Sequence, residues 1–374
     1  MKFLQKFKRV TYSTFYLPEI DGLRFLAVFS VVVILHITHY LNNKFYSGQL
    51  LKRNYWETFA LQGGEGVLLF FVISGFILSL PFARWRLNNG NAISLKNYYL
   101  RRLTRLEPPY IIALVILFIA QVWVLRMYSF ERLLPHFLAS VVYQHTTIFQ
   151  SFSWVLPVAW SLEVEVQFYV LAPLFFLLFL IRKKMIRWVF YTILIFGNAL
   201  CWFDSWKVGH VFSFLHAFFM GIFLADLYCS KVAFIKDGYF GFLIGLACLL
   251  AYLFIPSVDP RPFLHTSPLF FIKMVCMFIL FHSVLNNSHM KRLFSIEIIA
   301  IIGGMCYSIY LMHFAVISAT GTILMKTNLV SGNTSFFILY VLLMIMVVLI
   351  ISSLFFICFE KPFMKPVQFL KKRK

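Results

Sequence analysis

An arginine and two histidines interrupt an apolar stretch near the start of the chain. Residues 21–40, DGLRFLAVFSVVVILHITHY, carry Arg24 at the beginning and His36 and His39 near the end. Ionisable groups inside a long apolar segment are costly unless partners or water reach them, so they are candidates for function. A neutral imidazole can take a proton from a hydroxyl, and its ordinary pKa of about 6.5 suits base chemistry near neutral pH. The stretch therefore points to proton transfer or nucleophilic catalysis.

The elements that must position these groups are membrane helices. The chain of 374 residues is 61% hydrophobic and only 13% charged, whereas soluble proteins are about 45–50% apolar and about 25% charged. Apolar stretches long enough to cross a ~30 Å hydrocarbon core recur along it. The expected fold class is an all-α polytopic membrane protein, a single bundle of about ten transmembrane helices. The expected spans are roughly 22–41, 65–82, 108–125, 161–181, 188–204, 209–227, 238–255, 268–285, 299–325 and 335–359.

The distribution of basic residues predicts the orientation. With ten spans and the N-terminus inside, the cytoplasmic segments hold 24 Lys and Arg residues and the outward segments hold 8. An eleventh span within 133–152 would reverse every assignment after it, so that segment is expected to be amphipathic or re-entrant. The positive-inside rule therefore favours ten spans with both termini in the cytoplasm. We expect one domain, with spans over 22–359 and a basic cytoplasmic tail at 360–374.

The net charge of +20 lies mostly on the cytoplasmic face, where it would attract an anionic leaflet or an anionic cofactor. No nucleic-acid partner is expected. The six cysteines show no CxxC or Cys/His spacing, so no metal site is expected either.

Depth in the membrane brings the ionisable groups together. His36 follows Arg24 by twelve residues, about 18 Å along a helix, and belongs to the outer half of the membrane. The stretch AWSLEVEVQFY begins an inward-running helix with Glu163 and Glu165 at a similar depth. We expect one of these carboxylates to orient His36, and the sequence leaves open which one.

Two further motifs carry candidate residues. RRLTRLEPPY, residues 101–110, clusters Arg101, Arg102 and Arg105 so that 101/105 and 102/105 share a helical face. Topological anchoring accounts for this cluster as well as phosphate binding does. CYSIYLMH, residues 306–313, places two tyrosines and a histidine at spacings of three, which fits either aromatic packing or a site wall.

Glycines open the second expected span. GGEGVLLFFVISGFI, residues 63–77, permits close backbone approach and places Ser74 and Gly75 in mid-span. Taken alone, this pattern predicts packing between helices through small residues.

Taken in order, these motifs resemble the integral-membrane acyltransferase 3 family. The resemblance rests on DGLR with a late histidine, GxGVxxFFxISGF, RRxxRxxPxY, WSLxVExQFY and YSIYLxH, and it spans residues 20 to about 363. It implies transfer of an acyl group, most often acetyl, from cytoplasmic acyl-CoA to hydroxyls of surface carbohydrates. It also implies that the helix-one histidine is essential, that the arginines hold CoA and that the glutamate supports the site. In this chain these residues are His36; Arg24, Arg101, Arg102 and Arg105; and Glu165.

The sequence departs from the family pattern twice. Eleven residues instead of the usual ten separate Arg24 from His36, and one extra residue turns a helix by about 100°. Either the start of the helix is irregular or the two groups serve separate sites, and we expect separate sites. In addition, Glu163 replaces the family's alanine and Val166 its second glutamate, so Glu163 remains a candidate partner of His36.

The expected function is that of a membrane O-acyltransferase, an acyltransferase of groups other than aminoacyl groups, in the inner membrane of a bacterium. Acyl-CoA, most simply acetyl-CoA, would be the co-substrate, a carbohydrate the acceptor, and no metal is required. His36 would act as a base or accept the acyl group itself, and the sequence leaves both routes open. Walls for the sugar are expected from Trp160, Glu163, Tyr310 and His313. A flippase for a lipid-linked glycan and an acyl-CoA sensor without turnover are the rival classes.

Overall fold

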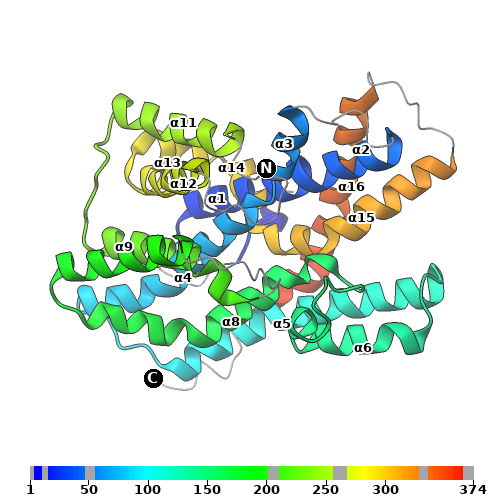
Figure 1. Cartoon of the computed structure of the whole chain (residues 1–374), viewed down its shortest axis with the longest axis horizontal. Coiled ribbons are helices and arrows are strands. Elements are labelled where there is room, and N and C mark those ends of the chain that lie inside the picture. The colour runs from blue at the N-terminus through cyan, green and yellow to red at the C-terminus, as the bar shows by residue number, and fades with distance from the viewer. Residues whose placement is uncertain are drawn as a thin grey trace.

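The computed structural model describes residues 4–10, 16–46, 55–200, 210–255, 268–327 and 336–364, without the side chains of 55–58. Every regular element in these ranges is a helix (Figure 1). Most of the expected basic tail, from residue 365 onward, lies outside the described residues. The all-α fold class predicted from the sequence is confirmed for the described part of the chain.

The first half of the chain contains helices α1 to α8. The elements are α1 Pro18–Phe29, a π-helical segment η2 Ser30–Ile37, α2 Thr38–Phe45, α3 Tyr55–Gln62, α4 Glu65–Leu87, α5 Leu95–Ile119, η3 Ala120–Val124, α6 Phe130–Val141, α7 His145–Phe149 and α8 Trp160–Phe175. Short 3₁₀ turns η1 Leu4–Phe7, η4 Pro157–Ala159 and η5 Phe176–Leu180 flank them.

The second half continues with α9 to α16. The elements are α9 Lys184–Leu200, η6 Val211–Phe214, α10 Leu215–Cys229, α11 Tyr239–Phe254, α12 Pro268–Asn286, α13 Ser288–Phe294, α14 Glu297–Gly304, α15 Cys306–Lys326, α16 Phe337–Phe355, η8 Phe356–Glu360 and η9 Lys361–Met364.

Eight helices in the described residues are long and apolar enough to cross a membrane. They coincide with eight of the ten predicted spans. They are Pro18–Phe45, Phe59–Leu87, Leu95–Val124, Pro157–Leu180, Val211–Cys229, Pro268–Asn286, Cys306–Lys326 and Phe337–Met364.

The other two predicted spans fall on α9 and α11. These helices have 17 and 16 described residues, about 26 and 24 Å at 1.5 Å per residue, which is shorter than a ~30 Å hydrocarbon core. The segment 133–152 forms α6 and α7 with a tight turn between them. Because α6 has only 12 residues, about 18 Å, this segment does not cross the membrane as a single helix.

Helices α4 and α10 pack backbone against backbone. A Cβ atom on Gly75 would overlap the carbonyl of Phe218, and one on Gly221 would overlap the carbonyl of Val72. Small residues allow this approach where lipid provides no hydrophobic driving force between helices. The prediction that the glycine motif of residues 63–77 packs helices is confirmed at Gly75.

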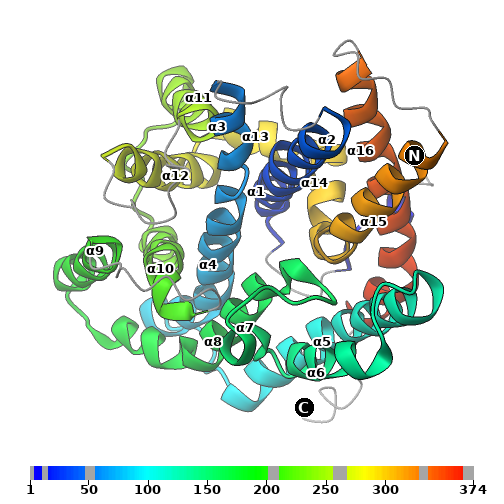
Figure 2. The same ribbon diagram turned by 45° about the vertical axis from the view of Figure 1, so that its right-hand side comes forward.

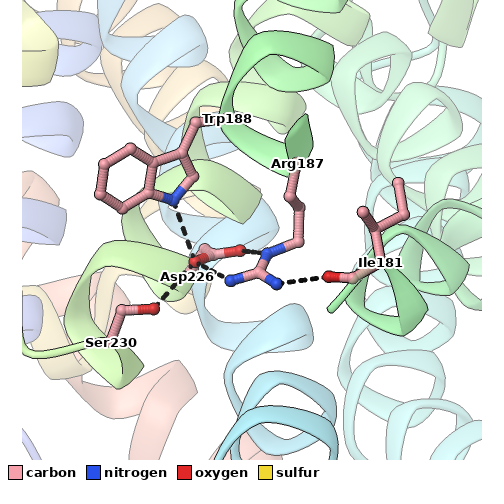
Figure 3. A network of polar contacts seen from close by, with 5 residues as sticks. All are labelled: Ile181, Arg187, Trp188, Asp226 and Ser230. Carbon is pink, nitrogen blue, oxygen red and sulfur yellow. Dashed lines mark hydrogen bonds and ion pairs between the residues drawn. The ribbon is translucent and has the colours of Figure 1, made fainter. Parts of the chain in front are cut away.

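A buried ion pair fixes α9 to α10 (Figure 3). Arg187 donates through Nε and Nη2 to the two carboxylate oxygens of Asp226, and its Nη1 donates to the carbonyl of Ile181. Trp188 and Ser230 donate to the same carboxylate at 3.3 and 3.1 Å. Because both charges are satisfied inside the protein, this network stabilises the packing of α9 against α10.

Candidate active site

A pocket with about 870 Å³ of empty space, open solvent included, lies among α1, α4, α5, α8 and α15, helices that can be followed in Figures 1 and 2. Four arginines, two glutamates and three tyrosines line it together with apolar side chains. The polar members are Arg9, Arg24, Arg102, Arg105, Glu165, Glu360, Tyr169, Tyr307, Tyr310, Ser74 and Ser161.

The arginines of the cavity carry more positive charge than their partners neutralise. Arg24 and Arg9 share the single carboxylate of Asp21, Arg9 at 3.1 Å. Arg102 lies 5.9 Å from the centre of the Tyr169 ring. In the part of the chain that the structure describes, Arg105 forms no hydrogen bond or ion pair, although it is half-buried. Several guanidinium donors are therefore available to an anion.

Arg101 does not belong to this array. Its side chain is exposed, and it does not line the cavity. The cluster also lies inside α5, which begins at Leu95, well before the span expected at 108–125. Because α5 is helical here, Arg102 and Arg105 share a face that turns inward while Arg101 turns away.

The two glutamates of the WSLxVE motif face different surroundings. Glu165 lines the cavity and accepts a hydrogen bond from Ser74 of α4. Glu163 is fully buried, where it accepts from the backbone N–H of Thr146 at 3.0 Å and from its hydroxyl. Residues two apart on a helix point about 200° apart. Glu163 therefore anchors the start of α7 and does not line the cavity.

Trp160 likewise lies outside the cavity lining. Its ring packs against Phe214 and Phe152, with centroids 5.6 and 6.4 Å away. The expectation that Trp160 and Glu163 form walls of the site is not met by this cavity. Tyr310 does form part of its wall, with its hydroxyl 2.7 Å from that of Ser161.

His36 pairs with His313. His36 Nδ1 lies 2.8 Å from His313 Nε2, and the rings stack at 4.9 Å. His313 Nδ1 lies 2.8 Å from the carbonyl of Tyr310, which can only accept. The network therefore assigns a proton to His313 Nδ1, a lone pair to its Nε2, and a proton to His36 Nδ1. This tautomer leaves a lone pair on His36 Nε2.

This arrangement corrects the predicted pairing of His36 with a glutamate. In the described residues, His36 makes no hydrogen bond to Glu163 or Glu165, and the orienting role falls to His313. Equal depth in the membrane brings groups to one level but does not set the direction in which each helix turns its side chains. The cavity reaches Tyr310, and His313 follows it by one helical turn on α15.

The irregular spacing between Arg24 and His36 has a structural cause. Residues Ser30–Ile37 form a π-helix, whose i→i+5 bonds accommodate an extra residue in an otherwise α-helical span. The irregularity lies in mid-span and not at the helix start. Gly63 packs on this segment, because a Cβ there would overlap the carbonyl of Ser30 and the amide of Leu35, five residues apart. Arg24 lines the cavity and His36 does not, and that the two groups serve separate sites stays a prediction.

His39 is exposed and lies 2.8 Å from the side chain of Asn43 through Nε2. It takes no part in the pair that His36 forms. The order of the two histidines relative to water is as expected from the sequence.

The model of the acyltransferase 3 domain matches residues 17–355. The chain belongs to the acyltransferase 3 family. The peptidoglycan O-acetyltransferase OatA of Listeria monocytogenes is 26% identical over 351 residues, which are 85% of this chain and 52% of that protein. The O-acetyltransferase OatA of Staphylococcus aureus is 27% identical over 341 residues, 83% of this chain and 52% of that protein. The chain spans about half the length of these relatives, and no solved structure matches it.

The match confirms the family resemblance drawn from the sequence motifs, and the enzyme class expected, an acyltransferase, agrees with it. Two cavity residues lie outside the matched range. Arg9 precedes it, and Glu360 follows it with one carboxylate oxygen bound to the N–H of Ser308 at 3.1 Å. Sequence reasoning interpreted Arg9 only as cytoplasmic charge and Glu360 only as an interface residue.

The sequence analysis included Tyr307 only as one of the two tyrosines of CYSIYLMH. In the structure, Tyr307 lines the cavity and connects α15 to α5. Its hydroxyl donates to the carbonyl of Leu106 at 2.9 Å, beside the consecutive Pro108 and Pro109. In this family member, the RRxxRxxPxY and YSIYLxH motifs therefore meet at one wall of the cavity.

The described residues contain no group of three or more His, Cys, Asp and Glu side chains that could hold a metal ion. Among the polar groups of the cavity, the guanidinium and hydroxyl groups can donate hydrogen bonds to an anion.

Proposed function

We propose that this protein is a membrane O-acyltransferase that moves an acyl group from acyl-CoA on the cytoplasmic side to a hydroxyl of a carbohydrate on the outer side. The main support for this proposal is the array of arginines in the cavity, in which Arg105 has no hydrogen-bond or ion-pair partner among the described residues. The His36–His313 pair lies on the same set of helices. Acetyl is the simplest acyl group, because both relatives named above are O-acetyltransferases.

The donor would bind with its phosphates among Arg24, Arg102 and Arg105. Guanidinium groups bind phosphate through paired hydrogen bonds, and in the described residues no hydrogen bond or ion pair occupies the donors of Arg105. The pantetheine arm would extend along the wall formed by Tyr307 and Tyr310. His313 lies six residues beyond Tyr307 on α15, about 9 Å further along the helix axis.

The transfer step follows from the tautomer of the histidine pair. His36 Nε2 takes the proton of the acceptor hydroxyl while the oxygen attacks the thioester carbonyl, the C–S bond breaks and the CoA thiolate leaves. The imidazolium formed on His36 keeps its Nδ1–H bond to His313 Nε2 and then returns the proton to the thiolate. Attack of His36 Nε2 on the thioester itself, followed by transfer to the hydroxyl, uses the same lone pair.

Glu165 would support this chemistry from the cavity wall. It lines the cavity beside Tyr310 and Ser161, and its negative charge favours cationic forms of groups near it. In this proposal it acts at the donor channel, because its hydrogen bond goes to Ser74.

The proposed orientation places both termini and the start of α5 in the cytoplasm of a bacterial cell, with the protein in the inner membrane and α9 and α11 completing ten spans. A cysteine at Asn88 should then be protected from a membrane-impermeant thiol probe added outside intact cells or spheroplasts. A cysteine at the exposed Met127 should react. The reverse pattern would overturn the orientation.

The acceptor is proposed to be a glycan of the cell envelope. One relative carries peptidoglycan in its name, so muramyl glycan fragments are the first acceptors to test. In this proposal the acceptor approaches His36, which is half-buried, from the outer side.

Purified protein in detergent tests the proposal. With acetyl-CoA and glycan fragments, we expect release of free CoA thiol that depends on the acceptor, and a gain of one acetyl group per product by mass spectrometry. Binding of acetyl-CoA without thiol release would favour an acyl-CoA sensor. Movement of a lipid-linked glycan across a vesicle membrane without acetylation would favour a flippase.

A further inference from the structure

The segment 4–10 precedes the range that matches the family, yet it contributes Arg9 to the wall of the cavity. Contacts hold this segment in place on three sides. Lys8 forms an ion pair with Glu297 at 2.8 Å, and the carbonyl of Lys6 accepts a hydrogen bond from Lys361. Arg9 donates to Asp21 at 3.1 Å. The segment therefore crosses between α1, α14 and η9 as a strap.

The guanidinium of Arg9 is only partly engaged. Nη1 donates to Asp21, whose other oxygen is 3.0 Å from the hydroxyl of Tyr16 and which also accepts from Arg24. Arg9 Nε is buried and has no hydrogen-bond partner in the described residues. An arginine has five N–H donors. A buried guanidinium with free donors on a cavity wall is costly unless a ligand accepts from it.

The charges around Arg9 favour an anionic ligand. Four arginines line the cavity, and the carboxylates against them are Glu165, Glu360 and Asp21, of which the last lies behind the wall. Glu360 and Glu165 already accept hydrogen bonds from Ser308 and Ser74. The four arginines outnumber these three carboxylates, so the wall beside Arg9 and Arg105 favours an anionic group.

We propose that Arg9 is a donor-binding residue, which contacts the phosphates of acyl-CoA and makes the strap of residues 4–10 part of the binding site. The inference rests on the proposed function, since it takes acyl-CoA to be the donor. CoA carries a diphosphate and a further phosphate on its ribose, so it presents more anionic groups than one arginine can bind. The strap supplies a guanidinium from outside the family domain for this larger charge.

The test compares Arg9→Ala with Lys6→Ala in the full-length protein in detergent. Lys6 lies on the same strap and carries the same charge, but its side chain is exposed. We expect Arg9→Ala to raise the KM for acetyl-CoA about tenfold or more, with the acceptor KM unchanged, because a charge-assisted hydrogen bond is lost. Lys6→Ala should stay within about twofold of the wild type.

A truncated donor separates binding from folding. Acetyl-pantetheine lacks the nucleotide and all its phosphates, so wild type and Arg9→Ala should use it with the same KM. If Arg9→Ala does not fold, Arg9→Lys takes its place, since a lysine keeps a charge for Asp21 but loses the forked donors. Equal penalties with acetyl-CoA and acetyl-pantetheine, or no penalty with either, would overturn the role of Arg9.

Arg105→Ala distinguishes this failure from failure of the proposed function. If Arg105→Ala weakens acetyl-CoA binding while Arg9→Ala does not, the cavity holds the donor and only the role of the strap is wrong. If neither variant changes acetyl-CoA binding in folded protein, the donor site itself is wrong.

Discussion

Two histidine pairs in this protein have almost the same geometry. His36 and His313 are joined at 2.8 Å with ring centroids 4.9 Å apart, and His136 and His145 are joined at 2.8 Å with centroids 5.0 Å apart. In each pair, Nδ1 of one ring meets Nε2 of the other, and the second ring is tied to a backbone carbonyl. The hydrogen bond itself therefore does not tell a catalytic pair from a structural one.

The surroundings of the two pairs differ. The His136 ring packs against Trp154 and Phe149, with centroids 4.0 and 4.2 Å away, and His145 is fully buried. His36 is half-buried, and its partner follows Tyr310 of the arginine-lined cavity by one turn. We call His136–His145 the closed pair, because its surroundings allow it only to hold α6 and α7 together. We call His36–His313 the open pair, because it has a free lone pair beside a cavity and can exchange a proton with a substrate.

The largest expected effect is that of removing the open pair. His36→Ala should lower turnover by about 10²- to 10⁴-fold, the usual contribution of a positioned acid–base group, and abolish it if the imidazole accepts the acyl group. Acetyl-CoA binding, measured by calorimetry, should remain close to that of wild type. Near-wild-type turnover in a His36→Ala protein would show that the open pair is structural as well.

His313→Ala tests whether His313 orients His36 in the open pair. Without His313, the tautomer and ring orientation of His36 are no longer fixed, so turnover should fall strongly while the KM for acetyl-CoA changes little. His313→Gln, whose amide oxygen can accept from His36 Nδ1–H, should recover part of the activity. A larger effect on KM than on kcat would place His313 in substrate binding instead.

The next effect tests the link between the cavity and the open pair. Arg105→Ala should raise the KM for acetyl-CoA by roughly 10- to 150-fold, because a hydrogen bond to a charged group contributes about 1.5–3 kcal/mol. Arg101→Ala is the matched control, since Arg101 is exposed and does not line the cavity. Equal effects from both variants in a steady-state assay would show that the arginine cluster of α5 serves only to orient the protein in the membrane.

Acid should lower the folding stability of the segment that contains the closed pair. Burial lowers the pKa of His145 to about 4, and burial and the charge of Arg132 lower the pKa of His136. An unfolded histidine has a pKa of about 6.5. Between these values the unfolded segment binds more protons, so the stability present above about pH 6.5 is lost as the pH falls toward 4.

Hydrogen exchange of residues 130–149 measures this loss, and protection should decrease from pH 7 to pH 5. His136→Phe keeps the aromatic contact with Trp154 but cannot be protonated, so its protection should depend less on pH. A protection factor of these amides that does not change with pH in the wild type would contradict the assignment of the closed pair as neutral.

The smallest expected effect is at His39. His39→Ala removes an exposed side chain that is hydrogen-bonded to Asn43, so activity should remain within about twofold of wild type with at most a small change in the acceptor KM. Loss of turnover in this variant would mean that the wrong histidine of VVVILHITHY was chosen.

Like the two histidine pairs, the arginines differ in their surroundings and not in their residue type. Arg187 is fully buried, and Asp226 and the carbonyl of Ile181 use its donors (Figure 3). Arg105 has no hydrogen-bond or ion-pair partner in the described part of the chain and faces a cavity. Sequence spacing identified Arg105 but could not rank it above Arg101, because it did not show where each side chain would find an acceptor.

The sequence by itself determined the elements, because apolar length and helical period are local properties. It predicted the all-α membrane fold and the family to which the chain belongs, and eight of its ten predicted spans are helices long and apolar enough to cross a membrane in the described residues. It also identified Arg24, Arg102, Arg105, Glu165 and Tyr310, which the structure places around one cavity. Motif order and residue type were sufficient for this.

Tertiary structure alone decided which of these residues meet. The π-helical segment at Ser30–Ile37 sets the direction of His36, and that direction leads to His313 on a helix 277 residues away. Glu163 was available at the right depth, but it points to Thr146, and Arg9 reaches the cavity from beyond the family domain. Such contacts depend on the rotation and packing of helices distant in sequence, which depth and local pattern do not specify.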